Sequence, residues 1–277
     1  MMDKHKLELV QLFSNLRLYK LANYTNEVLF DVGQEEQDEV KEVDALPSKV
    51  DWRSKKWVTT VKGHVPLPFH KVCSIKLRRK GRCNSCYAFS TVGALEGQLA
   101  KIKQQHMELS EQSITDCSAN NKNYGCRGCL SYHAFECIRD HGIQTHKSYP
   151  YKAKKNNKCL FKSNKSVIRI KKFRRFMNNK DKKLVQMVAD VGPISVLVHC
   201  SHSSWRFYKS GIYDNVNCDK KHIDHFVLLV GYVDQNPKSF WIVKNSWGTS
   251  WGENGYLRII KGNSMCEINF CAAYPEI

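Results

Sequence analysis

The sequence predicts an α+β protein with two lobes, because a helical half is followed by a stranded half. Apolar residues in the first half recur at alternating steps of three and four, which is the spacing of a helix that buries one face. In the second half, short apolar runs are separated by turn-forming residues, as in strands. A chain of 277 residues is long enough for one large domain or two small ones.

Three segments of the first half carry helical signals. Residues 85–105 show the helical spacing most clearly, at Ala88, Val92, Leu95, Leu99 and Ile102. Residues 110–117 predict a second, shorter helix, because Ser110 can cap its first turn. Residues 131–141 predict a third.

Four segments of the second half read as strands: residues 193–198, 225–233, 239–247 and 255–260. The second and third are joined by a short polar turn and predict a hairpin. In that hairpin His225 lies opposite Trp247, and Asn245 is one step along the same face.

The composition is that of an ordinary soluble protein, with 42% hydrophobic and 25% charged residues, and we expect no membrane span. The first thirty residues carry no signal-peptide pattern, since charged residues interrupt the apolar stretch. The twelve cysteines and the glycosylation triplets at Asn23 and Asn164 instead favour an oxidising, secretory compartment. We therefore expect that the native N-terminus lies upstream of Met1.

The net charge of +18 is not spread evenly along the chain. Residues 152–183, here called the basic segment, hold fourteen Lys or Arg and the single acid Asp181. Such a run is either a solvated surface or a site for anionic polymers. No nucleic-acid motif accompanies it.

Cys86 stands where the first predicted helix begins. The positive end of the helix dipole and its free N–H groups favour a thiolate, which is the nucleophilic form of cysteine. His225 at the start of a strand can accept the thiol proton, and Asn245 can orient the imidazole. Each residue alone has an ordinary structural explanation, and the hypothesis depends on all three together.

Three longer strings resemble segments of papain-like cysteine proteases of the cathepsin L, S and K type. Residues 81–90 are similar to the nucleophile segment, residues 224–232 to the histidine strand, and residues 241–256 to the asparagine segment. The resemblance covers residues 46–277 and implies a helical left lobe and a β-barrel-like right lobe, with the active-site cleft between them. It implies an endopeptidase with Cys86, His225 and Asn245 as catalytic residues. Residues 1–45 resemble a truncated inhibitory propeptide.

The resemblance also bears on the other cysteines. It implies the disulfides Cys83–Cys126, Cys117–Cys159 and Cys218–Cys266. The alternative of a zinc site built from Cys83-x-x-Cys86 and Cys126-x-x-Cys129 is disfavoured, because 39 residues separate the two pairs. We expect no metal and no cofactor. The pairing of the remaining cysteines stays open: Cys73, Cys129, Cys137, Cys200 and Cys271.

The resemblance places apolar residues around the side chain two positions before the scissile bond, so a residue such as Leu or Val is expected there. Phe226 stands where the family usually has a small residue and should narrow this pocket. Gly128 matches a glycine whose backbone pairs with substrate, and Trp247 matches a tryptophan that shields the active site. The pocket residues implied are Leu130, Leu197, Ile223, Phe226 and Cys271.

The sequence departs from the family at the oxyanion site. Sixteen residues, 65–80, are inserted before the nucleophile segment, so His64 or Lys80 falls where the family has a glutamine. The insertion is either genuine or a gene-model artefact. Two functions remain open: an endopeptidase with full or weakened activity, and an impaired homologue that binds peptides or anionic polymers.

The resemblance finally implies partners and a location. Protein and peptide substrates, the propeptide and cystatin-like inhibitors are expected to bind, and the protein is expected to be a monomer. A lysosomal or secreted location is expected as well.

Overall fold

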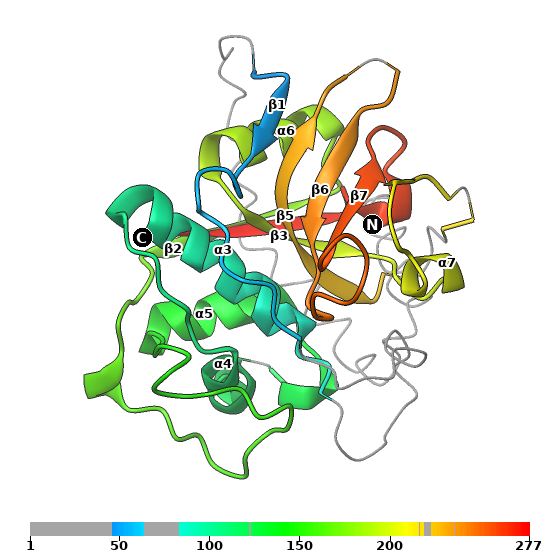
Figure 1. Ribbon diagram of the computed structural model, residues 1–277. Coiled ribbons are helices and arrows are strands. Elements are labelled where there is room, and N and C mark those ends of the chain that lie inside the picture. Colours follow the sequence, from blue (N-terminus) through cyan, green and yellow to red (C-terminus); the bar gives the residue numbers. More distant parts are fainter. Residues whose placement is uncertain (1–45, 64–82, 122, 216, 219–222, 236) are drawn as a thin grey trace, which may run out of the picture.

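The computed structural model describes residues 46–63, 83–121, 123–215, 217–218, 223–235 and 237–277, coloured in Figure 1. The predicted propeptide segment, the insertion at 65–80, and both candidate oxyanion residues, His64 and Lys80, lie outside the described residues. Cys73 lies outside them as well.

The three predicted helices are confirmed, and they gather in one lobe (Figure 1). The helix α4 is capped as the sequence indicated, because Ser110 Oγ accepts the N–H of Ser113 at 2.9 Å. The bounds of these helices are α3 Cys86–Lys103, α4 Glu111–Cys117 and α5 Ser131–His141.

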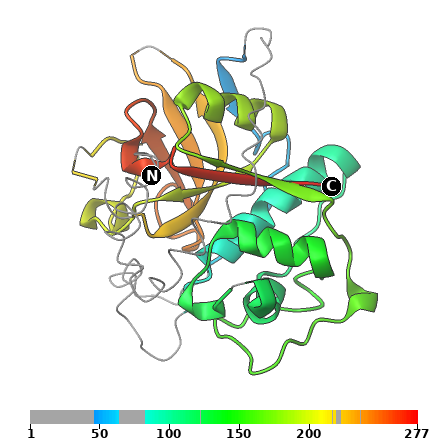
Figure 2. The ribbon, with the colours of Figure 1, turned by 180° about the vertical axis from the view of Figure 1, so that it is seen from behind.

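The other lobe is a sheet with the strand order β2-β8-β3-β5-β6-β7-β4, and β1 pairs with β5 off this path. All pairs are antiparallel except β4 with β7. The α+β class is thereby confirmed, and Figure 2 shows the sheet from behind. The strands are β1 Lys49–Asp51, β2 Lys172–Met177, β3 Ile194–Val198, β4 Ile212–Tyr213, β5 His225–Val233, β6 Phe240–Lys244, β7 Tyr256–Ile260 and β8 Cys271–Glu276.

The sequence did not predict every element. Strand β2 lies in the basic segment, where Lys172 and Arg174 hide its alternation by pairing with Glu276 of β8. Its other face packs on α5, with Phe173 stacked on Phe135. Strands β1, β4 and β8 were not predicted either. The helices that were not predicted are α6 Asp181–Val191, α7 Ser203–Arg206, η2 Ala119–Asn121, η3 Gly125–Arg127, η4 Ser163–Lys165 and η5 Met265–Glu267.

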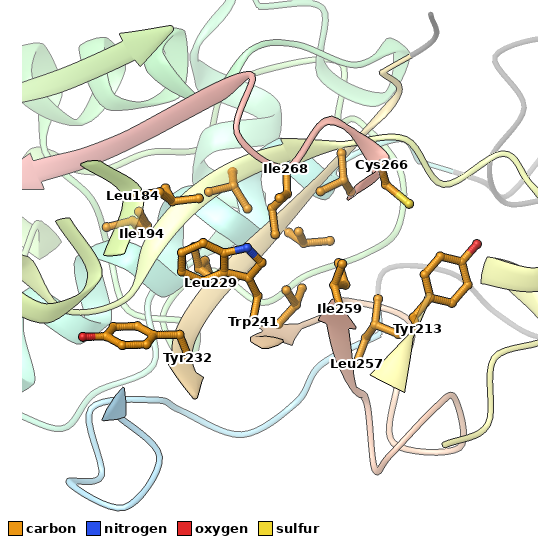
Figure 3. Packing of buried hydrophobic residues seen from close by; sticks show 14 of the residues in the cluster. Leu184, Ile194, Tyr213, Leu229, Tyr232, Trp241, Leu257, Ile259, Cys266 and Ile268 are labelled. Carbon is orange, nitrogen blue, oxygen red and sulfur yellow. The ribbon is translucent and has the colours of Figure 1, made fainter. Parts of the chain in front are cut away.

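Two apolar clusters lie on opposite sides of the sheet. One joins the sheet to α3 and α5 and contains Leu95, Phe135 and Leu228. The other lies beneath α6 and contains Leu184, Ile194 and Trp241 (Figure 3). Strand β5 is buried along its whole length, because it contributes side chains to both clusters.

Helix α3 approaches the sheet closely because it presents glycines there. A Cβ added to Gly93 would lie 2.8 Å from Leu228 on β5, and one added to Gly97 would lie 2.8 Å from the Pro193 ring. Both distances are below van der Waals contact, so a larger residue would require the Leu228 side chain or the Pro193 ring to shift. The two glycines therefore allow α3 to pack closely on the sheet.

Within the described residues, no helix combines the length and apolar character needed to cross a membrane.

Candidate active site

Cys86 is the first residue of α3, as the sequence predicted. The chain before it is held by the disulfide Cys83–Cys126 and by a hydrogen bond of 3.1 Å from the N–H of Asn84 to the carbonyl of Cys126. Its side chain is a free thiol and partly exposed. The fold therefore places this thiol at the positive end of an 18-residue helix.

The sulfur of Cys86 lies against the start of β5. Burial raises the pKa of the Cys86 thiol to about 11, and the nearby carboxylate of Asp224 adds to this. The backbone N–H groups of Phe226, Tyr87 and Cys86 itself act in the opposite direction, since they hydrogen-bond the sulfur. This contact places the thiol against Phe226, the residue that directly follows the predicted base His225.

The imidazole of His225 is held by Asn245. His225 Nε2 lies 2.9 Å from Asn245 Oδ1, and the same oxygen accepts the N–H of Ser246 at 2.7 Å. The second contact identifies this amide atom as the oxygen, so Nε2 is the donor and carries the proton. Nδ1 is then the ring nitrogen that can accept a proton.

The His225 side chain is shielded from water. Burial lowers the pKa of His225 to about 4, although the hydrogen bond that it donates to Asn245 opposes the shift. The ring of Trp247 lies 5.1 Å from the imidazole, and Trp251 packs edge-on against Trp247 at 5.2 Å. Burial thus disfavours either charge alone, the thiolate or the imidazolium. A proton transfer from Cys86 to His225 creates both charges at once, and each then offsets the other's desolvation.

The predicted hairpin is confirmed, and Leu228 pairs with Lys244 and Leu229 with Val243, in the predicted register. A bulge shifts the register by one residue from Gly231 onward. Trp247 does not pair with His225, because it forms a bridge with Gly63. The predicted strand 239–247 was too long, because β6 ends at Lys244. After Lys244, the N–H of Asn245 donates a hydrogen bond of 2.9 Å to the carbonyl of Gly255. Asn245 and Trp247 therefore lie in the loop that follows β6.

The predicted pocket residues lie mostly on the face of the sheet that meets the helical lobe. Leu197 on β3 pairs with Phe226 on β5, and the pairing of Val196 with Ala272 brings Cys271 of β8 beside Leu197. Leu197, Ile223, Phe226 and Cys271 are all buried in the cluster between the lobes. Phe226 is only 4% exposed, so its ring occupies space in this region.

Two further predicted positions are on the segment that leads into α5. Gly128 has φ +99°, a conformation that a residue with a side chain rarely adopts. Leu130 is partly buried against the cluster that contains Phe226. Cys129 lies between them, and burial raises the pKa of its thiol.

Sequence reasoning missed a group of charges buried between the lobes. Lys62 Nζ lies 2.9 Å from Glu111 Oε1 and 3.5 Å from Glu96 Oε1. The two carboxylate side chains are each only 2% exposed. Lys244 of β6 donates to the carbonyl of Thr59 at 2.9 Å and sits directly before Asn245. The network joins α3, α4 and β6, and so fixes the lobes that carry the predicted triad.

The electrostatics of this network follow from its burial. Burial raises the pKa of Glu96 and lowers that of Lys244 to about 8. Burial also opposes the charge on Glu111, but hydrogen bonds from His146 and Lys62 lower its pKa overall. A cavity of about 20 Å³ lies within the group, lined by Lys62, Glu96, Glu111 and Lys244 among others. One feature of the sequence could have indicated this buried network: Glu96 is the single acidic residue in the largely apolar helix α3.

The structure contains the disulfides Cys83–Cys126, Cys117–Cys159 and Cys218–Cys266, the three pairs that the resemblance implies. Cys200 is disulfide-bonded as well. The zinc alternative needs Cys83 and Cys126 as thiolates, but their sulfurs are bonded to each other. Within the described ranges, no group of three His, Cys, Asp or Glu side chains is arranged to hold a metal ion.

Comparisons with known proteins agree with this arrangement. Cathepsin L2 of Homo sapiens is 41% identical over 238 residues, which cover 84% of this chain and 66% of that protein. Cathepsin K of Mus musculus is 35% identical over 277 residues, 99% of this chain and 76% of that protein. A solved structure of digestive procathepsin L 3 from the Tenebrio molitor larval midgut has a TM-score of 0.76, with 29% identity, and the match covers 100% of this chain and 94% of that one.

The chain spans slightly less than two thirds of the length of human cathepsin L2, and 59% of the cathepsin L1 of Drosophila melanogaster. The sequence profile described as "Papain family cysteine protease" matches residues 69–276, which is most of the chain. With a free cysteine at a helix start, a histidine held by an asparagine and this match over both lobes, the chain belongs to the papain family of cysteine proteases.

Proposed function

We propose that this chain is a cysteine endopeptidase in which Cys86 is the nucleophile, His225 its general base and Asn245 the group that orients the base. The observation that carries the proposal is the 2.9 Å contact between His225 Nε2 and Asn245 Oδ1. It makes Nδ1 the ring nitrogen that can accept a proton, and the Cys86 sulfur lies against the adjoining N–H of Phe226.

The first half-reaction forms an acyl-enzyme. His225 Nδ1 takes the thiol proton, and the thiolate adds to the carbonyl carbon of the scissile peptide bond. His225 then returns this proton to the amine as the carbon–nitrogen bond breaks. The N–H of Cys86, which has no intrahelical acceptor in the first turn of α3, supports the developing oxyanion.

The second half-reaction releases the acyl group. Water replaces the amine, and His225 removes a proton from it as its oxygen attacks the thioester carbon. Cys86 leaves as a thiolate and takes the proton back from His225. Trp247, 5.1 Å from the imidazole, protects the His225–Asn245 bond from competing water through both steps.

Selectivity in this proposal comes from the apolar pocket formed by Leu130, Leu197, Ile223, Phe226 and Cys271. Since Phe226 is 4% exposed and fills part of the region, a small apolar side chain such as Val fits two positions before the cleaved bond. The backbone of Gly128 pairs with the substrate strand.

We further propose the partners and location that are typical of relatives. Residues 1–45 act as a shortened inhibitory propeptide, cystatin-like proteins inhibit the enzyme, and the protein is a monomer in lysosomes or outside the cell. The three disulfides and the bonded Cys200 support a location in an oxidising compartment.

A second function is kept open by one observation. Sixteen residues, 65–80, are inserted at the oxyanion site, so that His64 or Lys80 stands where the family has a glutamine as the second oxyanion donor. Loss of one such donor costs about 2.7–4 kcal/mol of transition-state stabilisation, roughly a hundredfold to a thousandfold in rate. The alternative is therefore a weakened or inactive homologue that binds peptides, or anionic polymers through the basic segment.

One experiment separates these functions. The purified, processed protein is treated with an epoxysuccinyl leucyl electrophile, and the adduct is located by peptide mass spectrometry. Hydrolysis of Val-Arg and Leu-Arg fluorogenic peptides is measured on the same sample. Cys86→Ser serves as the unlabelled variant, and Cys137→Ser, which changes a buried free cysteine on α5, serves as the matched control.

Labelling at Cys86 together with turnover supports the endopeptidase. Labelling without turnover means that the thiol is activated but the oxyanion site is impaired, which favours the second function. Absence of labelling at Cys86 in folded protein overturns the catalytic proposal.

A further inference from the structure

The proposed catalysis leaves one sequence motif unused. Asn164-Lys165-Ser166 is an acceptor triplet for N-linked glycosylation. Asn164 is the middle residue of the single-turn helix η4, and its side chain is exposed. Lys162 and Lys165, on either side of it, are exposed too. An accessible asparagine in such a triplet can carry a glycan without disturbing the packed structure.

We propose that Asn164 is an N-glycosylation site and that its glycan covers part of the basic segment. The donor is an oligosaccharide joined to a lipid through a diphosphate. The Asn164 amide nitrogen forms a bond to the anomeric carbon of the first sugar and loses one proton. The bond from that carbon to the diphosphate oxygen breaks, and the lipid diphosphate leaves.

The disulfides support the required compartment. Cys117–Cys159 lies only five residues before Asn164 in the chain, and Cys83–Cys126 and Cys218–Cys266 join distant segments of both lobes. Disulfides of this kind persist in the secretory lumen and outside the cell. The enzyme that transfers oligosaccharides to such triplets works in that same lumen, so a chain that acquires these bonds passes the transferase.

The local fold indicates when the transfer takes place. The segment after η4 closes onto the end of α5 through hydrogen bonds from Ile143 N to Ile168 O, 3.0 Å, and from Val167 N to Ile143 O, 2.9 Å. Ser166 Oγ lies 3.4 Å from the carbonyl oxygen of Ile143 and 3.4 Å from that of Ile168. It also packs on Gly142, where an added Cβ would be 2.3 Å from the hydroxyl. Ser166 is thus engaged in the folded protein, so transfer precedes this closure.

The position of η4 leaves the proposed active site clear. It lies at the outer edge of the helical lobe, at the lower left in Figure 1, while α3 begins toward the other side. Figure 2 shows the same separation from behind. A glycan at Asn164 therefore lies over the lysines of the basic segment and away from Cys86. It should weaken binding to anionic polymers without changing peptide hydrolysis.

The test is expression of the full chain, behind an added signal peptide, in cultured eukaryotic cells. The mass of the secreted protein is measured by mass spectrometry before and after treatment with a peptide N-glycosidase in ¹⁸O-labelled water. We expect the glycan mass to be lost and Asn164 to be converted to an ¹⁸O-labelled aspartate. Peptide mapping separates this site from the second triplet, Asn23-Tyr24-Thr25.

Matched variants sharpen the result. Asn164→Gln and Ser166→Ala remove the glycan, whereas Ser166→Thr and Lys165→Arg keep the triplet and retain it. On a heparin column the glycosylated protein should elute at lower salt than both the deglycosylated protein and Asn164→Gln. Secreted, disulfide-bonded protein with unmodified Asn164 overturns the site, and equal elution overturns the covering role. Electrophile labelling of Cys86 in the same sample tests the protease separately.

Discussion

His225 Nε2 and Asn245 Oδ1 lie 2.9 Å apart, and the same amide oxygen accepts the N–H of Ser246 at 2.7 Å. The second bond prevents the amide from turning over, because its nitrogen cannot accept that N–H. The imidazole is consequently held in one tautomer before any substrate binds. The catalytic proposal depends on this preorganisation more than on the helix dipole at Cys86.

Replacement of Asn245 tests the orientation directly. Asn245→Ala removes a buried hydrogen bond to a group that becomes charged, worth about 1.5–3 kcal/mol, so kcat/KM should fall roughly tenfold to a hundredfold. KM should change little, because Asn245 contacts the base and not the substrate. Fluorogenic peptide hydrolysis measures both constants.

Asn217→Ala, at an exposed asparagine outside the site, is the control for this change and should leave the kinetics unaltered. Unchanged kcat/KM in a folded Asn245→Ala enzyme would show that Asn245 does not orient His225.

Phe226 offers a test of the pocket. Phe226→Gly removes a phenyl ring that is 4% exposed, so the pocket should accept larger side chains. We compare kcat/KM for a peptide with Phe two positions before the scissile bond and for one with Val there. The Phe/Val ratio should rise about tenfold or more, since a change in the fit of a side chain to an apolar pocket is worth about 1–3 kcal/mol. A peptide series that varies only this position measures the ratio.

The matched control is Phe240→Ala, which removes a phenyl ring from β6 at the far end of the hairpin from His225. It should lower stability without changing the ratio. If Phe226→Gly lowers hydrolysis of both peptides equally, the ring supports the fold and does not shape the pocket.

The sequence predicted those helices and strands whose buried faces form a continuous apolar pattern. Helix α3 and strand β5 bury continuous apolar patterns, so both were found close to their true ends. Strand β6 was extended too far, because Asn245 and Trp247 continue its alternation while Asn245 N already bonds Gly255. Strand β2 was missed, because ion pairs with Glu276 place charges where an apolar pattern was sought.

The charges between the lobes were missed for a related physical reason. Lys62 and Glu111 look in sequence like residues of a solvated surface, and only the approach of α3, α4 and β6 buries them with Glu96. No local pattern encodes that approach. Cys86 and His225 are 139 residues apart in the sequence, and hydrophobic periodicity gives no information on contacts over such a separation. The two residues were assigned to one site because the family resemblance covers both segments.

Removal of the central cation should destabilise the junction of the lobes. Lys62→Met leaves Glu96 and Glu111, each 2% exposed, without their shared partner. Leaving a buried charge unpaired costs about 3–5 kcal/mol, so the urea midpoint should fall clearly. The double variant Lys62→Met, Glu111→Gln should lose less than the single one, since it removes one of the stranded charges.

Lys55→Met, at an exposed lysine of the same segment, should have almost no effect. A single variant as stable as the parent would mean that water or another cation already compensates the two carboxylates.

His146 makes the stability of the helical lobe depend on pH. Its Nδ1 lies 3.3 Å from Glu111 Oε2, and this hydrogen bond raises the pKa of His146 above its usual value near 6.5. Lys62 opposes the shift, and Glu108 adds to it. A raised histidine pKa stabilises the folded state below about pH 6.5, and this contribution is lost as the pH rises through the folded-state value.

His146→Gln should therefore reduce stability at pH 5 and have a much smaller effect at pH 9. The difference between parent and variant in urea unfolding free energy, measured from pH 5 to 9, isolates this contribution. His225 acts in the opposite direction, because its pKa is lowered to about 4, and its effect cancels in the difference. His141→Gln, at an exposed histidine that ends α5, is the control. A difference that does not decline toward alkaline pH would contradict a charged His146–Glu111 pair.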